Sequence, residues 1–293
     1  MLNSRTIECL IRAGAFDSLR HTRAQLLDGY EKVIEVAQER QRERDLGQIS
    51  LFEIMGESEE GAGRGPSALG LLRDVPEMPQ LEKLRAEKEL LGYYISGHPM
   101  DAYQCDQTAF GNCSLAHLPK RRDGDEVNVV AMIGEVVKKK DRNGRDMAFV
   151  QILDLDATAE AIFFHDAFEK FREYVVPENV LLINGRVNIR DDVPKILVKQ
   201  VQAIDEVREK ADYIFEIFAD YATVPDTFLS TLRQLLQAHR GKRDVRLTLQ
   251  LDRGQLIVAL PRTFRVRVTN ELMTEIKRIP GVRRLRFSME NGR

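Results

Sequence analysis

The spacing of the apolar residues along this chain changes from a helical period to a strand period near residue 126. Before that point, apolar residues recur every three or four positions, as on one face of a helix. Between Glu126 and Ile204 they alternate with polar residues, as in half-buried strands. The elements expected in this stretch are strands at 127–133, 149–153 and 159–164, a helix at 166–174, and strands at 180–187 and 195–198.

The order of these elements points to one fold. Three strands, a helix and two strands is the order of a five-stranded OB-fold β-barrel, whose helix lies between the third and fourth strands. A turn at 141–145 joins the first two strands, and its Asn143-Gly144 pair is the strongest short hairpin signal. We therefore expect an OB-fold domain over residues 123–207.

The segments on either side of the barrel are expected to contain helices. Upstream, helical periodicity covers 3–18 (with a turn at Gly14), 22–44 and 79–94, and residues 57–67 have the composition of a linker. Downstream, the expected helices are 226–238 and 270–279, and the expected strands are 245–251, 255–260 and 285–288.

These patterns predict a multidomain α+β protein with an N-terminal helical segment, a five-stranded OB-fold β-barrel and a small C-terminal α+β domain. The expected parts are a helical segment (1–47), a docking peptide (48–52), a flexible linker (53–78), a helical connector (79–122), the OB-fold domain (123–207) and a C-terminal partner-binding domain (208–293).

Composition excludes several classes of protein. Lys and Arg total 44 against 46 Asp and Glu, so net charge gives no sign of nucleic-acid binding, and only local charge can. No stretch approaches the roughly 20 apolar residues of a membrane span, and no signal peptide precedes the first helix. We expect a cytoplasmic chain without a membrane partner.

The sequence contains no catalytic constellation and predicts no cofactor for this segment. Asp154 and Asp156 come nearest to a metal-binding pair, but they follow a strand, where turn-forming aspartates are far commoner. A zinc site built from His98, Cys105, Cys113 and His117 was weighed, and its spacings do not match paired Cys-x-x-Cys ligands. Unligated structural residues are the favoured interpretation, and three cysteines are too few for a disulfide framework.

The segment Gln48-Ile49-Ser50-Leu51-Phe52 has the pattern of a docking peptide. It lies where a long charged helix ends and a linker begins. Leu51 and Phe52 can fill an apolar pocket on a partner, while the Gln48 amide sets the register by hydrogen bonding. Taken alone, so short a match can also arise by chance.

The loop between the first two barrel strands is the favoured place for nucleic-acid binding. It carries Lys138, Lys139, Lys140, Arg142 and Arg145, and the corresponding loop of OB-folds lines the oligonucleotide groove. Phe149 on the next strand offers a stacking face. The alternative is a solvated hairpin, because acidic residues outnumber basic ones over the rest of the barrel and the chain has no Trp.

Arginines gather toward the C-terminus at positions 262, 265, 267, 283, 284 and 286. Arg265 and Arg267 alternate on an expected strand, which places both on one face. The patch has two interpretations, contact with nucleic acid or a positive face for an acidic protein, and the protein partner is favoured. Arg283, Arg284 and Arg286 belong to the same expected surface.

Several motifs in order resemble the C-terminal part of the bacterial replicative DNA polymerase III alpha subunit. The motifs are residues 2–17, the Gln48–Phe52 peptide, the run E-K-E-L-L-G-Y-Y-I-S-G-H-P at 87–99, and residues 147–154 with the barrel around them. The run at 87–99 is specific, whereas the barrel alone is not. The resemblance covers essentially the whole chain and weakens after Ala211.

The resemblance implies a set of partners. Residues 1–47 would include the end of a helix-hairpin-helix element, and Gln48, Leu51 and Phe52 would bind the ring-shaped sliding clamp. The barrel would lie near single-stranded template DNA, with contacts from Lys138, Lys139, Lys140, Arg142 and Arg145. The C-terminal domain would dock the tau subunit of the clamp loader, at the nucleoid-associated replisome.

The polymerase core of that family, with its Mg-binding carboxylates, and its PHP domain correspond to sequence upstream of this chain. We therefore expect this segment to be inactive alone as a DNA-directed DNA polymerase and to act in processivity. The alternative is an OB-fold RNA- or tRNA-binding module of a translation enzyme. The docking peptide and the scarcity of aromatic stacking residues disfavour it, and the missing catalytic groups disfavour a free-standing hydrolase.

Overall fold

The computed structural model describes residues 3–45, 72–190 and 193–289. The docking peptide and most of the expected linker lie outside the described residues. The chain divides into two compact units, Met1–Pro99 and Met100–Arg293, so the expected 79–122 connector is shared between them. In the part described, no helix is long and apolar enough to cross a membrane.

The first unit contains three α-helices in its described ranges. They are α1 (Ser4–Arg12), α2 (Arg23–Asp45) and α4 (Gln80–Leu91). The second half of the helix–turn–helix expected at 3–18 is only a 3-10 turn, Asp17–Leu19. Helix α4 ends three residues before the expected Tyr94, because Gly92 takes a left-handed conformation with φ of 81° and stops it.

A buried ion pair holds the first unit together. Arg23 donates to the Glu87 carboxylate at 2.8 Å and to Asp17 at 2.7 Å, and the Arg23 and Glu87 side chains are almost fully buried. Glu87 also accepts the backbone N–H groups of Ile95 at 2.7 Å and Ser96 at 2.9 Å. Within the specific 87–99 run, the Glu87 carboxylate therefore holds in place the turn that follows α4.

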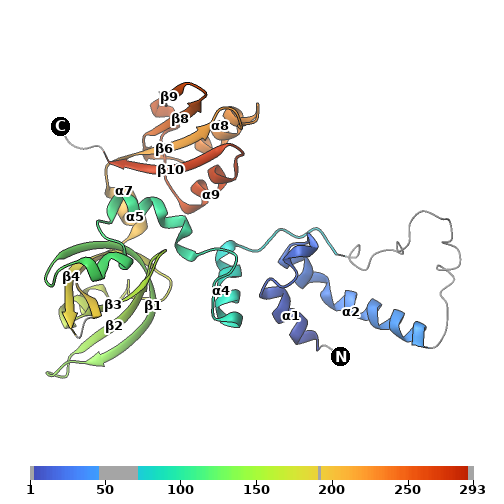
Figure 1. Ribbon diagram of the computed structural model, residues 1–293, viewed down its shortest axis with the longest axis horizontal. Coiled ribbons are helices and arrows are strands. Elements are labelled where there is room, and N and C mark those ends of the chain that lie inside the picture. Colours follow the sequence, from blue (N-terminus) through green and yellow to red (C-terminus); the bar gives the residue numbers. More distant parts are fainter. Residues whose placement is uncertain (1–2, 46–71, 191–192, 290–293) are drawn as a thin grey trace. The chain divides into compact units, whose positions relative to one another are not determined.

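The expected OB-fold barrel is confirmed. The barrel strands close in the order β1-β2-β3-β5-β4, with β3 and β5 parallel (Figure 1). Its elements are β1 (Glu126–Lys140), β2 (Asp146–Leu153), β3 (Thr158–Phe163), α6 (His165–Phe171), β4 (Val180–Arg190) and β5 (Val193–Ala203). Alternate residues of every strand fill the interior, and Phe168 and Phe171 of α6 join this core.

The C-terminal part is a sheet with helices packed on it, in the strand order β10-β6-β8-β9 (Figure 1). Its elements are α7 (Ile204–Lys210), β6 (Tyr213–Asp220), α8 (Phe228–Ala238), β7 (Arg240–Arg243), β8 (Val245–Leu251), β9 (Gly254–Ala259), α9 (Asn270–Arg278) and β10 (Val282–Met289). Apolar residues of α8 and α9 share one core with β6, β8 and β10. The sequence analysis missed α7, β7 and β6, although β6 is the strand between β10 and β8.

Short helices connect the barrel to the C-terminal sheet within the second unit. They are the 3-10 helix η3 (Pro99–Tyr103), α5 (Gln104–Phe110) and the 3-10 helix η4 (Leu115–Lys120). Helix α5 packs against both β1 and β10, and the Cys105 thiol donates to the Leu285 carbonyl at 3.3 Å. The sheet and the barrel therefore share α5 as a common support.

Candidate nucleic-acid interface

The hairpin between β1 and β2 is fixed by one aspartate. Asp141 accepts the backbone N–H groups of Asn143 at 2.8 Å and Arg145 at 2.9 Å, and Gly144 adopts the positive φ of 77° that the turn requires. The Arg145 guanidinium returns to the same carboxylate at 2.9 Å. These bonds, led by the Arg145 N–H, lower the pKa of Asp141. The Asn-Gly signal correctly located this turn.

Of the predicted loop cations, two are neutralised by neighbouring carboxylates. Arg145 pairs with Asp141, and Lys140 with Asp146 at 3.1 Å. Arg142 is exposed and has no ionic partner within the described ranges. The hairpin therefore offers a phosphate fewer free charges than its sequence suggests.

Two lysines lie over aromatic rings of the barrel. The Lys139 ammonium lies 4.8 Å from the centre of the Phe149 ring, and that of Lys138 lies 6.0 Å from Phe168. Neither lysine has a carboxylate partner in the part described, so both keep their charge available. Lys138, Lys139 and Arg142 are the cations of this hairpin without a carboxylate partner in the part described, and Lys138 and Lys139, as consecutive residues of β1, point to opposite faces of the strand.

Phe149 lies on the outer face of the barrel. Its register partners are Val137 on β1 and Ile162 on β3, and its ring is half-buried. The neighbours Ala148 and Val150 point into the barrel core instead. Phe149 is thus placed where an unstacked base could reach it, with Lys139 at the edge of the same surface.

The hairpin between β4 and β5 contributes a residue that the sequence analysis missed. Arg190, the last residue of β4, is exposed and pairs in register with Val193. Ligands of OB-folds contact this loop together with the β1–β2 loop. The signal available in the sequence was an arginine three residues after the end of the fourth expected strand, 180–187.

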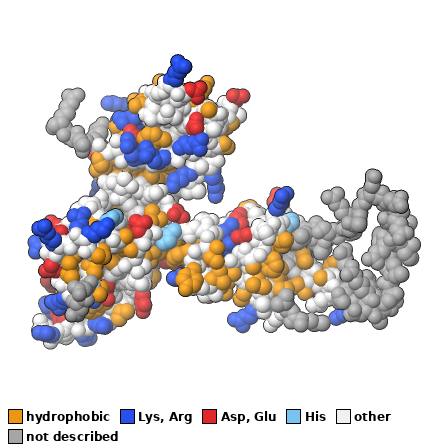
Figure 2. Space-filling view, viewed as in Figure 1, with side chains coloured by type: hydrophobic (Ala, Val, Ile, Leu, Met, Phe, Trp, Pro, Cys, Tyr) orange, Lys and Arg blue, Asp and Glu red, His pale blue; other side chains and the backbone are white. Residues whose placement is uncertain are grey.

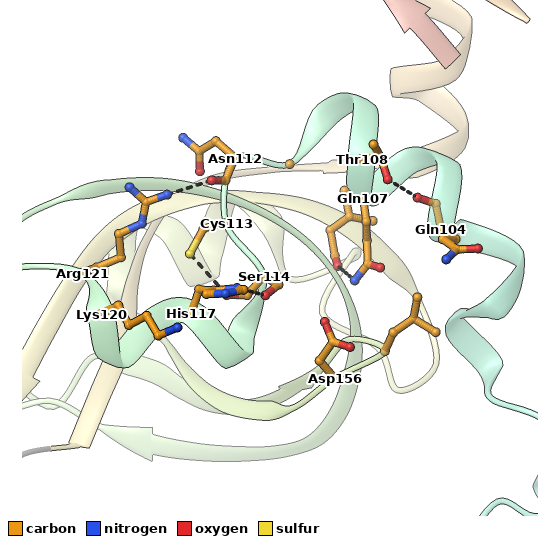
Figure 3. A pocket seen from close by; sticks show the side chains of 13 residues that line it. Gln104, Gln107, Thr108, Asn112, Cys113, Ser114, His117, Lys120, Arg121 and Asp156 are labelled. Atoms are coloured by element: carbon orange, nitrogen blue, oxygen red, sulfur yellow. Dashed lines mark hydrogen bonds between the residues drawn. The ribbon is translucent and has the colours of Figure 1, made fainter. Parts of the chain in front are cut away.

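A polar groove of about 670 Å³ lies between α5 and η4 (Figure 3). Gln104, Gln107 and Thr108 line it from α5. His117, Lys120 and Arg121 line it from η4 and the residue after it. The Ser114 Oγ and His117 Nδ1 atoms are 2.7 Å apart, and the Arg121 guanidinium donates to the Asn112 carbonyl at 2.8 Å. The groove carries amides and cations but no arrangement of a nucleophile with a general base and an orienting carboxylate in the contacts described.

The two aspartates after β2 form a turn, as predicted. Asp154 accepts the N–H groups of Asp156 and Ala157 at 2.9 Å and that of Leu115 at 2.7 Å, which ties η4 to the barrel. Among the described residues, no group of three or more His, Cys, Asp or Glu side chains is placed to hold a metal ion, and the Cys105 thiol is buried against Leu285. Burial raises the pKa of Cys105 to about 11.

Most of the C-terminal arginines are paired with carboxylates. The pairs are Arg265–Asp244 at 2.7 Å, Arg267–Glu209 at 2.6 Å, Arg283–Asp220 at 2.7 Å and Arg286–Glu216 at 2.7 Å. Arg284 instead stacks on Phe218, with 4.4 Å between the guanidinium and the ring centre. Lys and Arg side chains are spread over the visible face of this domain (Figure 2). Its positive charge is therefore largely compensated by these pairs.

Arg265 and Arg267 share a face, but they are not on a strand. Only Val266 between them forms isolated bridges, to Arg240 and Arg243, and a 3-10 turn precedes Arg265. The expected strand is wrong at this point because only one residue of the segment, Val266, pairs with β7. The alternation survives, since Val266 is buried and both arginines point away from the core.

Comparisons with known proteins support the OB-fold and identify relatives that match nearly the whole chain. A family model described as an OB-fold nucleic acid binding domain matches residues 130–204. The DNA polymerase III subunit alpha of Saccharopolyspora erythraea is 32% identical over 287 residues, which is 95% of this chain and 24% of that protein. The subunits of Mycobacterium tuberculosis and Escherichia coli are 27% and 25% identical over similar spans.

The chain thus spans about a quarter of the length of the curated relatives it matches. A solved structure of Rim1, a mitochondrial single-stranded DNA binding protein from S. cerevisiae, is 13% identical with a TM-score of 0.24. That match covers 28% of this chain and 96% of Rim1. The resemblance to the DNA polymerase III alpha subunit is confirmed.

Proposed function

We propose that this chain is the part of a replicative DNA polymerase alpha subunit that tethers the enzyme during DNA replication. In this proposal the chain carries no polymerase chemistry and lowers the rate at which the polymerase leaves the primer terminus. Weak contacts with a clamp, with single-stranded DNA and with the clamp loader add up, because one polypeptide holds them all at high effective concentration. The similarity to polymerase alpha subunits over 95% of the chain carries the proposal.

The clamp contact is assigned to Gln48, Leu51 and Phe52. Binding of a peptide spanning residues 38–60 to the sliding clamp of the same organism tests this directly. Leu51→Ala and Phe52→Ala should each weaken binding about tenfold or more, as expected for anchors that fill a pocket. Ile54→Ala, an apolar truncation outside the motif, is the matched control. Equal affinity of all variants would reject the assignment.

Single-stranded DNA is assigned to the outer face around Phe149 and to Lys138, Lys139 and Arg142, with Arg190 at its border. Fluorescence anisotropy with an oligo-dT at several salt concentrations measures both affinity and the number of phosphate contacts. Removing one cation that contacts a phosphate should reduce the salt slope by about 0.7. The matched control is Arg172→Gln, an exposed arginine of the same barrel that has no ionic partner in the described part of the chain.

The same experiment tests the alternative, an RNA- or tRNA-binding module. A specific observation favours keeping it, since the matching family model carries the name tRNA anti-codon. A module of that kind binds folded tRNA more tightly than oligo-dT at equal salt. The polymerase proposal expects the opposite order, and loss of DNA binding in the Lys139→Gln variant.

The C-terminal domain is assigned a protein partner, the tau subunit of the clamp loader. The support is the arginine-rich sheet face, where Arg284 and Arg286 flank the Phe218 ring. Surface plasmon resonance of the whole chain on immobilised tau would test it. Arg284→Glu should abolish binding, whereas Arg253→Glu in the β8–β9 turn should not. Unchanged binding by Arg284→Glu would remove this face from consideration.

A further inference from the structure

A second pocket, of about 680 Å³, lies between α7, β7 and the start of α9. It is separate from the β1–β2 hairpin and from the polar groove beside η4, and it shares no lining residue with that groove. Six cationic side chains line it: Arg208, Lys210, Arg240, Lys242, Arg243 and Arg267. Three carboxylates, of Asp205, Glu209 and Glu271, line it as well, so the wall is positive overall.

Two backbone segments in direct contact form one wall of this pocket. The Gly241 N–H donates to the Arg265 carbonyl at 3.0 Å, and the Arg267 N–H donates to the His239 carbonyl at 2.8 Å. A side chain at position 241 would place its Cβ 2.2 Å from the Arg267 nitrogen, so only glycine permits this approach. The wall that carries Arg240 and Lys242 is therefore held in place by the backbone.

The cations differ in how far they are already neutralised. Arg208 is committed to the buried Asp106, Lys210 to Glu206, and Arg267 to Glu209. Arg240 and Lys242 are exposed and have no ionic partner among residues 3–45, 72–190 and 193–289. Arg243 is near Asp212 at 3.7 Å. Among the described residues, the pocket lining thus has two uncompensated cations, at alternate positions of β7, and one uncompensated carboxylate, that of Glu271.

Helix α9 begins at the opposite wall. Thr269 caps it by accepting the Leu272 N–H at 3.2 Å. The N–H groups of Asn270 and Glu271 belong to the first turn and have no intrahelical acceptor. The Asn270 side chain is hydrogen-bonded to Tyr103. The pocket therefore combines main-chain donors and two cations that have no ionic partner among the described residues.

We propose that this pocket binds a phosphoryl group. Its oxygens can accept from the α9 N–H groups on one side and from Arg240 and Lys242 on the other, which is how helix starts bind phosphate.

Isothermal titration of the whole chain with inorganic pyrophosphate tests the pocket. The wild-type chain should bind saturably, and a double Arg240→Gln, Lys242→Gln variant should bind about tenfold more weakly or worse. The matched control is Arg233→Gln with Arg253→Gln, which removes two exposed arginines elsewhere in the same domain that have no ionic partner among the residues the structure describes. Absence of saturable binding, or an equal loss in the control, would overturn the proposal.

A variant with the opposite sign removes the ambiguity of misfolding. Glu271→Gln deletes the one uncompensated carboxylate and should tighten pyrophosphate binding a few-fold, a gain that damage to the fold cannot produce. Unchanged or weaker binding by this variant would count against the site.

The source of the phosphate is settled by comparing two further ligands, ADP and a 5′-phosphorylated oligo-dT, as competitors of pyrophosphate. Competition by ADP alone identifies a free nucleotide, and competition by the oligonucleotide alone identifies a nucleic-acid strand. Because the Lys139→Gln variant leaves this pocket intact, it should bind pyrophosphate normally even where barrel binding to DNA is lost.

Discussion

Asp106 and Arg208 are 102 positions apart and form a bidentate ion pair with both side chains buried. The Arg208 Nε and Nη2 atoms lie 2.7 Å and 2.6 Å from the two Asp106 carboxylate oxygens. The pair joins α5, which precedes the barrel, to α7, which follows it. The two helices that flank the barrel in sequence, α5 and α7, are thus joined by a buried ion pair.

Removing one partner of this pair should destabilise the second unit strongly. Asp106→Asn leaves the buried Arg208 charge with only the exposed Asp205 carboxylate near it, and breaking a buried pair in this way costs about 3–5 kcal/mol. Guanidinium denaturation measures the change. Asp205→Asn, at an exposed carboxylate 3.4 Å from the same arginine, should change stability by less than about 0.5 kcal/mol. Equal effects of the two variants would show that burial of the pair does not matter.

The first unit should lose stability in acid through Glu87. Burial on its own raises the pKa of this carboxyl, but the N–H groups of Ser96 and Ile95 and the Arg23 guanidinium outweigh it and lower the pKa from 4.5 to about 2. Ionised Glu87 therefore stabilises the folded unit above pH 4.5, and this contribution disappears as the pH falls from 4.5 toward 2.

Hydrogen exchange of peptides from residues 80–98, corrected for the intrinsic rate at each pH, measures that loss between pH 7 and pH 3. Glu87→Gln should already exchange quickly at pH 7 and change little with pH. Glu82→Gln, at an exposed position of the same helix, should behave as wild type. A wild-type profile for Glu87→Gln would contradict the prediction.

Releasing Arg145 from Asp141 should strengthen binding to single-stranded DNA. Asp141→Asn keeps the side-chain oxygen that accepts the Asn143 and Arg145 N–H groups, so the hairpin keeps its turn. It removes the negative charge that neutralises the Arg145 guanidinium. Affinity for oligo-dT at low salt should rise about threefold, in line with one charge interaction near a protein surface. Asp252→Asn in the β8–β9 turn is the control, and weaker binding by Asp141→Asn would place the DNA elsewhere.

The barrel should tolerate no side chain at Gly185. This glycine sits at the irregularity between β4 and β5, where a Cβ would lie 2.5 Å from the Leu197 carbonyl oxygen and 2.6 Å from Ile196 Cγ2. Gly185→Ala should cost about 1–3 kcal/mol, since backbone must move to make room. Gly134→Ala, whose nearest neighbour would be 3.1 Å away, should cost less. Thermal denaturation compares the two, and a neutral Gly185→Ala would contradict the close approach.

The sequence was sufficient for features that depend on near neighbours. The alternation of apolar residues through β1 to β5 specified the barrel, and the Asn143-Gly144 pair specified its first hairpin, because both signals act over a few residues. The similarity to polymerase alpha subunits could be recognised from the 87–99 run. The docking peptide at 48–52 was also predicted from the sequence, and it stays a prediction that lies outside the described residues.

Only the tertiary structure decided which charges are free. In sequence, six arginines look alike. They are Arg142, which has no ionic partner among the described residues, and Arg145, Arg265, Arg267, Arg283 and Arg286. Folding gives those five a carboxylate partner, and for Arg267 and Arg283 that partner lies 58 and 63 positions away. It also brings Gly241 against Val266 and so creates the pocket beside α9. Such contacts join segments that are far apart in the chain. Neither segment's sequence indicates which residue it will contact, because long-range packing of the backbone sets each partner.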